Sequence, residues 1–313
     1  MTQTTEVTQG IPAPDPASFR ADWLAWREAA EQRRRDPHGF LAYRAVHFLD
    51  DRPRSVAGVP GRWSTGPAGP VVELGTDETL LVDGREITGR HAFGPVAERE
   101  FRRVATLAPQ VPGVDVVLEL SRRGGNDLLR PLDPAHPLRA DYLETPAYEP
   151  DPAWVLDARF ERYSVPLARE IEAAVDGIVH VHDAVGEVVF TVDGEEHRLL
   201  VLGRDGLDDL GIVLFRDATS GVTTYAASRS LQLPLPAPGS RDAAEQVATL
   251  TLDLNRAGNL QCAYTDHAPC PLAPARNHLP FAVEAGERIP VFRSGSRDAA
   301  NAAARAAGPE QAR

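Results

Sequence analysis

Hydrophobic positions near the start of the chain recur with helical spacing. They are Phe19, Trp23, Trp26 and Ala30. Asp15 stands where it can cap the helix, and Pro16 suits its first turn. The pattern therefore predicts one amphipathic helix that begins near residue 15. The apolar segment that follows, residues 40–49, fits a short helix or a buried strand equally well.

Beyond residue 70 the pattern has the period of β-strands. Predicted strands span residues 71–74, 79–82, 85–88, 114–120, 154–163, 187–192, 195–202, 211–215, 223–227, 228–233, 248–254 and 281–284. Asp83-Gly84 and Asp193-Gly194 are typical of tight hairpin turns. We therefore expect a mainly β protein (α+β by content), with a β-sandwich or barrel-like body in two lobes and an N-terminal helix.

Prolines concentrate in a connection between the two halves of the chain. They stand at positions 131, 134, 137, 146, 150 and 152. We expect residues 15–150 to form the helix with a first β lobe, and residues 151–292 to form a C-terminal β lobe. Residues 1–14 and 293–313 have little to bury, which predicts a disordered tail at each end.

The charge of the chain excludes several kinds of chemistry and partner. Its 313 residues carry a formal net charge of −12, and all 33 basic residues are arginine. A chain without lysine has no Schiff-base lysine and no phosphate-binding P-loop lysine. Because the balance is acidic and no basic stripe occurs, we expect no nucleic-acid partner.

The sequence also predicts where the protein works. Its N-terminus lacks the charged start and apolar run of a secretory signal, and no stretch has the length of an apolar membrane helix. Two cysteines do not make a disulfide framework. We therefore expect a cytoplasmic protein with no membrane partner and no evident cofactor, while the oligomeric state is left open.

Two C-terminal stretches resemble a known signature. Residues 215–225 read Phe-Arg-Asp-Ala-Thr-Ser-Gly-Val-Thr-Thr-Tyr, and Arg229 follows. Residues 252–257 read Leu-Asp-Leu-Asn-Arg-Ala, and after them come Cys262, Cys270-Pro271-Leu272, Asn277 and the run Glu-Ala-Gly-Glu at 284–287. Together they resemble the bacterial family catalogued as domain of unknown function 1684 (DUF1684). That family has no established activity, so the resemblance implies no reaction.

One loop departs from the family pattern. Where the family has Tyr-Asn-Pro-Pro-Cys, residues 258–262 read Gly-Asn-Leu-Gln-Cys, and its Asp-Phe-Asn is here Asp253-Leu254-Asn255. Losing a ring and two prolines gives the loop more conformational freedom. We therefore interpret the chain as a divergent member that keeps the family's frame while its pocket volume or ligand has changed.

Polar residues of this region are candidates for a ligand site. They are Asp217, Thr219, Tyr225, Arg229, Asp253, Asn255, Asn259, His278 and Glu284. In one interpretation Arg229 and Tyr225 clamp a carboxylate or phosphate in a pocket. In the other, Asp217 and Arg229 form a buried pair, and Asp253 with Asn255 caps a loop. We predict that Asp217 and Arg229 share one polar network, with Arg229 partly reachable from a cleft.

Two groups of residues could be considered as metal ligands. They are Cys262, His267 and Cys270 in one loop, and His180, His182 and His197 on neighbouring strands. Structural zinc takes four ligands, so the cysteine loop would need His278 or Asp253 in addition. The alternation around residue 181 more simply makes the histidines the solvated face of a strand. We therefore expect no stoichiometric zinc, and two packed thiols or an occasional disulfide.

The residues leave two functions open, and they do not decide whether the protein is an enzyme. The first is a small-molecule site in the C-terminal lobe, with Glu284 and Glu287 available for acid–base chemistry. The second is a non-catalytic binding or assembly module whose polar cluster is structural. A concave pocket around Arg229 would favour the first function, and a closed cluster the second.

Overall fold

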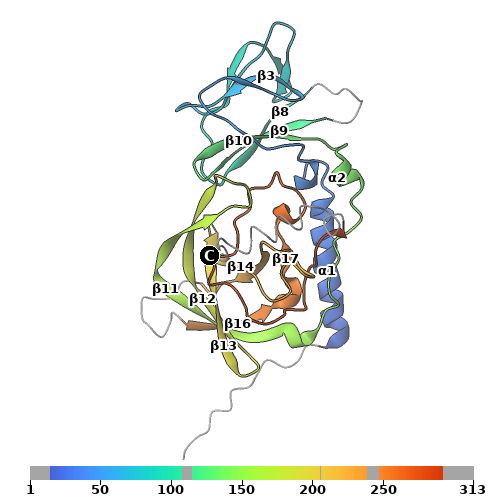
Figure 1. Cartoon of the computed structure of the whole chain (residues 1–313), viewed down its shortest axis with the longest axis vertical. Helices are drawn as coiled ribbons and strands as arrows, with labels where there is room; N and C mark the ends of the chain where they lie inside the picture. Colours follow the sequence, from blue (N-terminus) through green and yellow to red (C-terminus); the bar gives the residue numbers. More distant parts are fainter. Residues whose placement is uncertain (1–14, 108–114, 205, 238–246, 292–313) are drawn as a thin grey trace, which may run out of the picture.

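The computed structural model describes residues 15–107, 115–204, 206–237 and 247–291 of the chain. These residues form three antiparallel sheets and a long N-terminal helix, arranged in Figure 1 as an upper and a lower lobe. The prediction of a mainly β fold is confirmed, and none of the sheets closes on itself within the described ranges. The expected tails, 1–14 and 293–313, lie outside those ranges.

Two sheets make the N-terminal lobe. The six-stranded sheet has the order β1 (His47–Phe48), β10 (Asn126–Leu132), β9 (Val117–Arg123), β8 (Phe101–Thr106), β5 (Leu80–Val82) and β6 (Arg85–Ile87). The four-stranded sheet has the order β2 (Arg54–Val56), β3 (Val59–Ser64), β4 (Val71–Glu73) and β7 (Arg90–Ala92). Trp63 and Leu120 belong to the shared core of this lobe. Asp83 and Gly84 both have positive φ, which confirms the predicted turn between β5 and β6.

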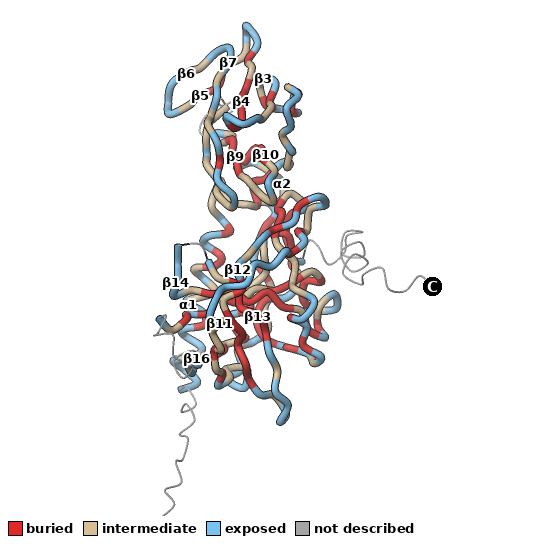
Figure 2. Tube along the Cα trace, turned by 90° about the vertical axis from the view of Figure 1, so that its left-hand side faces the viewer, coloured by how far each residue is buried: buried red, intermediate tan, exposed pale blue. Residues whose placement is uncertain are grey.

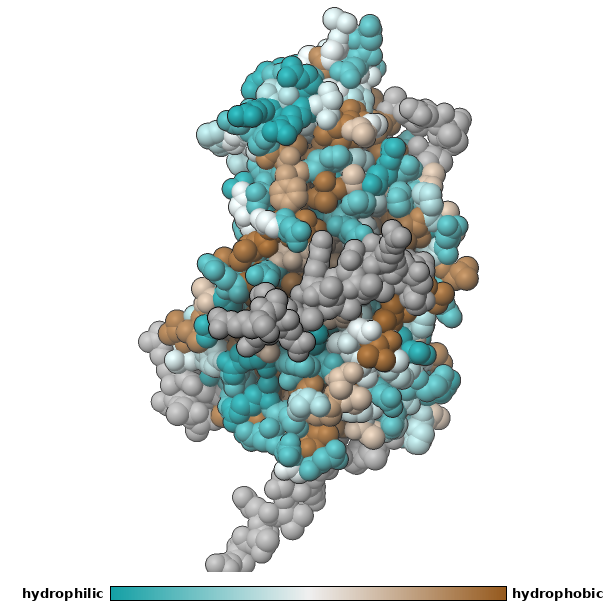
Figure 3. All heavy atoms as spheres, in the orientation of Figure 1, coloured by the Kyte–Doolittle hydropathy of each residue, from teal (hydrophilic) through white to brown (hydrophobic). Residues whose placement is uncertain are grey.

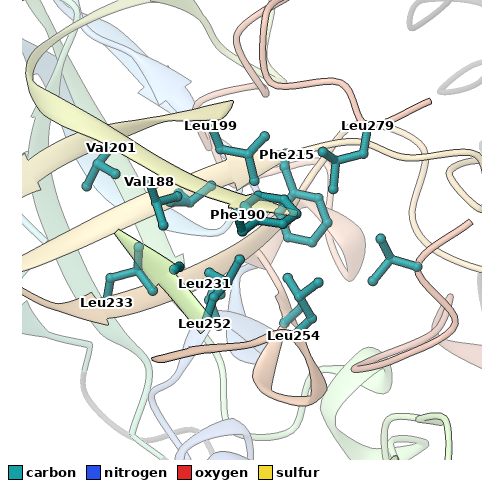
Figure 4. Packing of buried hydrophobic residues seen from close by; sticks show 14 of the residues in the cluster. Val188, Phe190, Leu199, Val201, Phe215, Leu231, Leu233, Leu252, Leu254 and Leu279 are labelled. Carbon is teal, nitrogen blue, oxygen red and sulfur yellow. The ribbon is translucent and has the colours of Figure 1, made fainter. Parts of the chain in front are cut away.

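One seven-stranded sheet makes the C-terminal lobe. Its order is β16 (Val247–Asp253), β11 (Val155–Glu172), β12 (Val179–Val192), β13 (Glu195–Arg204), β14 (Leu207–Phe215), β15 (Arg229–Pro234) and β17 (Gly258–Asn259). Asp193-Gly194 makes the predicted turn between β12 and β13. The inner face of the sheet carries a large core in which Phe160, Phe190 and Phe215 are almost fully buried. Figure 4 shows Leu231 and Leu233 of β15, Leu252 of β16 and Leu254, just after β16, packed in the same core.

The N-terminal helix, α1 (Pro16–Arg34), is capped as its sequence predicts. Asp15 accepts a hydrogen bond from the backbone N–H of Ser18 at 3.0 Å, and Trp23 and Ala30 are buried. The helix runs along the C-terminal lobe, although the N-terminal lobe follows it in sequence (Figure 1). Trp23 fixes this position because its indole N–H donates to the Asn255 carbonyl at 3.1 Å. Among the described residues, no helix combines the length and apolar character needed to cross a membrane.

Short helices complete the chain. They are η1 (Phe40–Ala42), α2 (Pro137–Ala140), η2 (Pro152–Trp154), η4 (Leu254–Arg256) and η5 (Gln261–Ala263). The ambiguous segment 40–49 thus contains both alternatives, since η1 comes first and the short strand β1 follows. The proline-rich connection runs between β10 and η2, although Pro131 itself lies within β10.

Two predicted strands are wrong. Residues 223–227 form a turn, in which the backbone N–H groups of Thr223 and Thr224 both donate to the Thr219 carbonyl. Residues 281–284 form no strand, and Phe281 lies in a bend. The carbonyl of Val283 instead accepts a hydrogen bond from the Arg229 guanidinium. The backbone groups of both segments are paired with loops and a side chain rather than with a neighbouring strand.

The two lobes touch through a small apolar contact. Leu128 of β10 packs with Ala173 and Ile178, which lie in the turn that joins β11 to β12. Figure 2 shows buried residues running from one lobe toward the other at this junction. The contact matters for the site below, because several signature residues lie near it.

Candidate functional site

The Asp217–Arg229 pair is the centre of the C-terminal signature. Pairing of β14 with β15 sets Phe215 opposite Arg229, and Asp217 follows two residues after that strand. The Arg229 guanidinium meets the Asp217 carboxylate at 2.6 Å, and both side chains are 0% exposed. Burial lowers the pKa of Arg229 from its ordinary value, and the Asp217 charge opposes that effect. The pair is therefore a fully enclosed ion pair.

Most of the remaining hydrogen-bonding groups of this pair are used inside the fold, although Arg229 Nε has no partner among the described residues. Asp217 Oδ1 accepts from the backbone N–H of Thr219 at 2.7 Å and from its hydroxyl at 2.5 Å. Arg229 also donates to the carbonyls of Val283 and Ala285. Three segments of the signature are thus tied together by one arginine. The prediction of a shared polar network is confirmed, but the expected access to Arg229 from a cleft is wrong.

Asp253 and Asn255 close the next turn. Asp253 Oδ1 accepts from the backbone N–H of Asn255 at 3.1 Å, which caps η4. The side-chain amide of Asn255, itself buried, makes two hydrogen bonds of 2.9 Å with the backbone of Asp151. These contacts correspond to the capping interpretation of the two residues. They hold β16, η2 and α1 at one point.

A buried polar network around Glu287 was missed in the sequence. It contains Glu31, Arg34, Tyr142, Thr145, Asn259, Tyr264 and Glu287. Arg34 bridges Glu31 at 2.7 Å and Glu287 at 2.5 Å, and the backbone N–H of Asn259 donates to Glu287 at 2.7 Å. The signal existed, because Arg34 lies one helical turn beyond Ala30 on the buried face of α1.

Tyr142 and Tyr264 complete that network as neutral hydroxyls. Burial raises the pKa of each above its ordinary value. Tyr142 donates to Glu31 at 2.6 Å, while Thr145 contacts both tyrosine hydroxyls. The network joins α1 to the end of the signature.

Two predicted site residues lie apart from these clusters. His278 and Glu284 are exposed at the surface of the C-terminal lobe. The neighbours of Glu284 in the chain, Val283 and Ala285, are buried and give their carbonyls to Arg229. The structure therefore does not bring the Glu284 carboxylate together with the enclosed pair.

Tyr225 belongs to a third cluster, which contains the two cysteines. Its side chain is hydrogen-bonded to Cys262, and the backbone N–H of Cys262 donates to Cys270 Sγ at 3.3 Å. Both cysteines are free and buried. Searched across the described ranges, His, Cys, Asp and Glu side chains form no group of three or more that could hold a metal ion.

The interpretation of His180 and His182 as a solvated face is wrong for His180. This residue is 3% exposed and shares a 2.7 Å hydrogen bond with the Pro269 carbonyl. Val179 and Val181 are the outward side chains, at 44% and 52% exposure. His180 is buried because its side of the strand faces the N-terminal lobe.

The N-terminal lobe holds a hollow that sequence reasoning also missed. It has a volume of about 250 Å³ and lies where β1 meets β2. Its lining residues are Val46, His47, Phe48, Leu49, Asp50, Arg52, Arg54, Ser55, Val56 and Trp63. Trp63 and Val56 are buried, whereas Asp50, Arg52 and Arg54 are exposed. The hollow thus combines an apolar floor with charged groups at its mouth.

The charges at that mouth are not all neutralised. Arg54 pairs with Asp50 at 2.6 Å. For Arg52, by contrast, no ion pair occurs with any residue that the structure describes. Burial lowers the pKa of His47, which keeps this wall neutral near pH 7. One cationic group is therefore available beside the hollow.

Comparison with known proteins places the C-terminal half of the chain. Residues 140–288 match the family described as "Protein of unknown function (DUF1684)". The chain belongs to the DUF1684 family. A solution NMR structure of an uncharacterized protein from Haloarcula marismortui is 30% identical, with a TM-score of 0.40; the match covers 48% of this chain and 78% of that one. No curated protein matches the chain.

Membership agrees with the residues that carry the resemblance. Residues 215–225 and 284–287 both fall inside the matched range. So does the loop 258–261, where the sequence departs from the DUF1684 pattern. The N-terminal lobe, with its hollow, lies before the matched range.

Proposed function

We propose that this DUF1684 protein is a non-catalytic binding module. In this proposal the signature residues brace the C-terminal lobe, and a small molecule with an apolar body and a carboxylate binds in the hollow of the N-terminal lobe. The observation that carries it is the complete enclosure of Arg229 and Asp217. An arginine that clamps a ligand has to keep an open face, and this one has none.

The other acidic groups of the signature support the same proposal. Asp253 pairs with Arg256 at 3.0 Å while capping η4, and Glu287 accepts from Arg34 and Asn259. A general acid or base must reach a substrate within hydrogen-bond distance. Carboxylates that already bind partners within the fold are better suited to holding segments together than to proton transfer.

The hollow supports binding of a small anion with an apolar part. Ligand pockets in proteins are concave and mostly apolar, with a few placed polar groups. Here Trp63 and Val56 supply the apolar floor, and Arg52 supplies a cation without a partner among the described residues. On the face shown in Figure 3, apolar and polar residues are interspersed over both lobes. In the hollow both kinds of group line one space.

Ligand-observed NMR tests this proposal with benzoate and its uncharged analogue benzamide. We expect saturation transfer to benzoate, a much weaker signal for benzamide, and loss of the benzoate signal in Arg52→Gln. Arg85→Gln, which removes an exposed arginine of β6 outside the hollow, is the matched control and should bind as the wild type does. Equal binding by both variants, or none by the wild type, would contradict the proposal.

A small-molecule site in the C-terminal lobe is the second candidate. Its support is Asn259, whose Oδ1 is buried with no hydrogen-bond partner among the described residues. A ligand that donates to this oxygen would satisfy it. Such a ligand would bind equally well to wild-type protein and Arg52→Gln, which separates the two candidates.

A further inference from the structure

The two cysteines of the chain meet inside the C-terminal lobe. Cys262 lies on η5, and Cys270 comes eight residues later. Their thiols are hydrogen-bonded to each other, and the backbone N–H of Cys262 donates to Cys270 Sγ at 3.3 Å. The chain has only these two cysteines, so each thiol has the other as its sulfur partner.

The surroundings shift the pKa values of the two thiols in opposite directions. Hydrogen bonds from the Cys262 thiol and backbone, from the backbone N–H of Gln261, and the charge of Arg130 lower the pKa of Cys270. The hydrogen bond to Cys270 and burial raise the pKa of Cys262. A thiolate is the reactive form of cysteine, so Cys270 is the stronger nucleophile of the two at neutral pH.

Cys270, whose pKa is lowered, is also the more exposed of the two cysteines. Cys270 is 9% exposed and Cys262 is 2% exposed. Only a small reagent can reach such a site, and hydrogen peroxide is one. A low-pKa cysteine next to a second cysteine is also the arrangement found at thiols that are oxidised reversibly.

We propose that Cys262 and Cys270 are a reversible redox pair, which a small peroxide oxidises to an intramolecular disulfide. Cys270 Sγ attacks one peroxide oxygen, the O–O bond breaks, and the leaving hydroxide takes the proton that the Cys270 thiol gave up. Cys270 is then a sulfenic acid. Cys262 Sγ attacks Cys270 Sγ, the S–O bond breaks, and the hydroxide leaves with the Cys262 proton. The pair loses two electrons, and the products are a disulfide and two molecules of water.

The disulfide would tie η5 to the segment that contacts the β11–β12 turn. The carbonyl of Cys270 accepts a hydrogen bond from Ala174 at 2.8 Å, and Pro271 forms a β-bridge with Ala173. Oxidation thus adds a covalent closure of loop 262–270 at the point where the two lobes touch. Constraining the unfolded chain in this way raises stability in the entropic account of disulfides.

Peptide mass spectrometry tests the pair directly. Cleavage after Arg256 and Arg276 releases one tryptic peptide, 257–276, that holds both cysteines. The full chain is treated with hydrogen peroxide at a dose that oxidises glutathione in a parallel sample, denatured and alkylated with iodoacetamide. We expect this peptide to lose two hydrogens and to escape alkylation, and dithiothreitol to restore two alkylated cysteines. A doubly alkylated peptide after peroxide, or a cross-link between chains, would overturn the proposal.

Four variants assign the roles. Cys262→Ser should leave Cys270 as a sulfenic acid that reacts with dimedone, whereas Cys270→Ser should leave Cys262 unlabelled. Gln261→Pro removes one backbone donor to Cys270 at the first residue of η5, a position that accepts proline. Gln261→Ala keeps that donor and is its control. We expect oxidation to slow several-fold in Gln261→Pro alone, and equal rates in the two variants would count against the assignment of Cys270.

Discussion

Both carboxylate oxygens of Asp217 accept hydrogen bonds from groups within the protein. Oδ2 receives Arg229 at 2.6 Å, and Oδ1 receives Thr219 and Val283. A buried charge is tolerated only when it is paired and hydrogen-bonded. At the scale of single residues, then, the polar signature is explained by partners within the fold.

Burial also disfavours charge on His180, a residue that can gain or lose a proton near neutral pH. Burial lowers its pKa, and Arg99, Glu98 and Arg123 of the N-terminal lobe face it. The folded state therefore keeps His180 neutral while the unfolded chain binds a proton more readily.

The pH dependence of stability follows from that difference. As pH falls below about 6.5, the ordinary value for histidine, the unfolded state gains protons that folded His180 does not, so stability declines. His180→Gln keeps a donor for the Pro269 carbonyl and should flatten this decline, measured by urea unfolding between neutral and mildly acid pH. The exposed His278→Gln is the control and should leave the slope unchanged. A slope that survives in His180→Gln would contradict the expectation.

At the scale of elements, two glycines of the signature play opposite parts. Gly286 has a φ of +76°, and a Cβ there would lie 2.3 Å from the Ala257 carbonyl. Gly258, in β17, has room, because the nearest atom to its Cβ would be Glu287 Oε2 at 3.5 Å. Position 258, where the family has tyrosine, thus still has room for a side chain. This agrees with the interpretation that the chain keeps the family's frame while this loop has changed.

Paired substitutions separate the two glycines. Gly258→Ala should raise the free energy of unfolding by about 0.5–1 kcal/mol, because it restricts the unfolded chain. Gly286→Ala should lower it by more than about 2 kcal/mol, because positive φ and the overlap with Ala257 act together. Thermal or urea unfolding measures both. A destabilised Gly258→Ala protein would mean that the rest of the lobe has adapted to a residue without a side chain.

Much of this element-level description was available in the sequence. The alternation around Phe160, the Asp-Gly turns and the Asp15 cap are local signals, and each predicted the right element. The polar clusters could not be predicted from the sequence, because they depend on which distant segments come together in the fold. For Arg229 the sequence left two interpretations open, a ligand clamp and a buried pair, because it does not show that the carbonyls of Val283 and Ala285 accept from the guanidinium. His180 looked solvated because nothing local indicates the neighbouring lobe.

At the scale of the whole molecule, enclosed polar pairs join segments that are distant in sequence. Arg229 binds the segment at 283–285, and Arg34 of α1 binds Glu287 in the same stretch. Asn255 meets both α1 and η2. These contacts converge on the DUF1684 region and hold its sheet, its C-terminal segment and the N-terminal helix as one body. We therefore infer that the signature residues serve to hold these segments together.

The free energy of unfolding of Arg229→Met tests that claim most directly. Removing one partner of a buried ion pair leaves the other uncompensated, so we expect a loss of about 3–5 kcal/mol. Arg256→Met breaks the partly exposed pair with Asp253 in the same signature and should lose less than about 1 kcal/mol. An Arg229→Met protein as stable as the wild type, or more stable, would show an arginine kept for a ligand rather than for the fold.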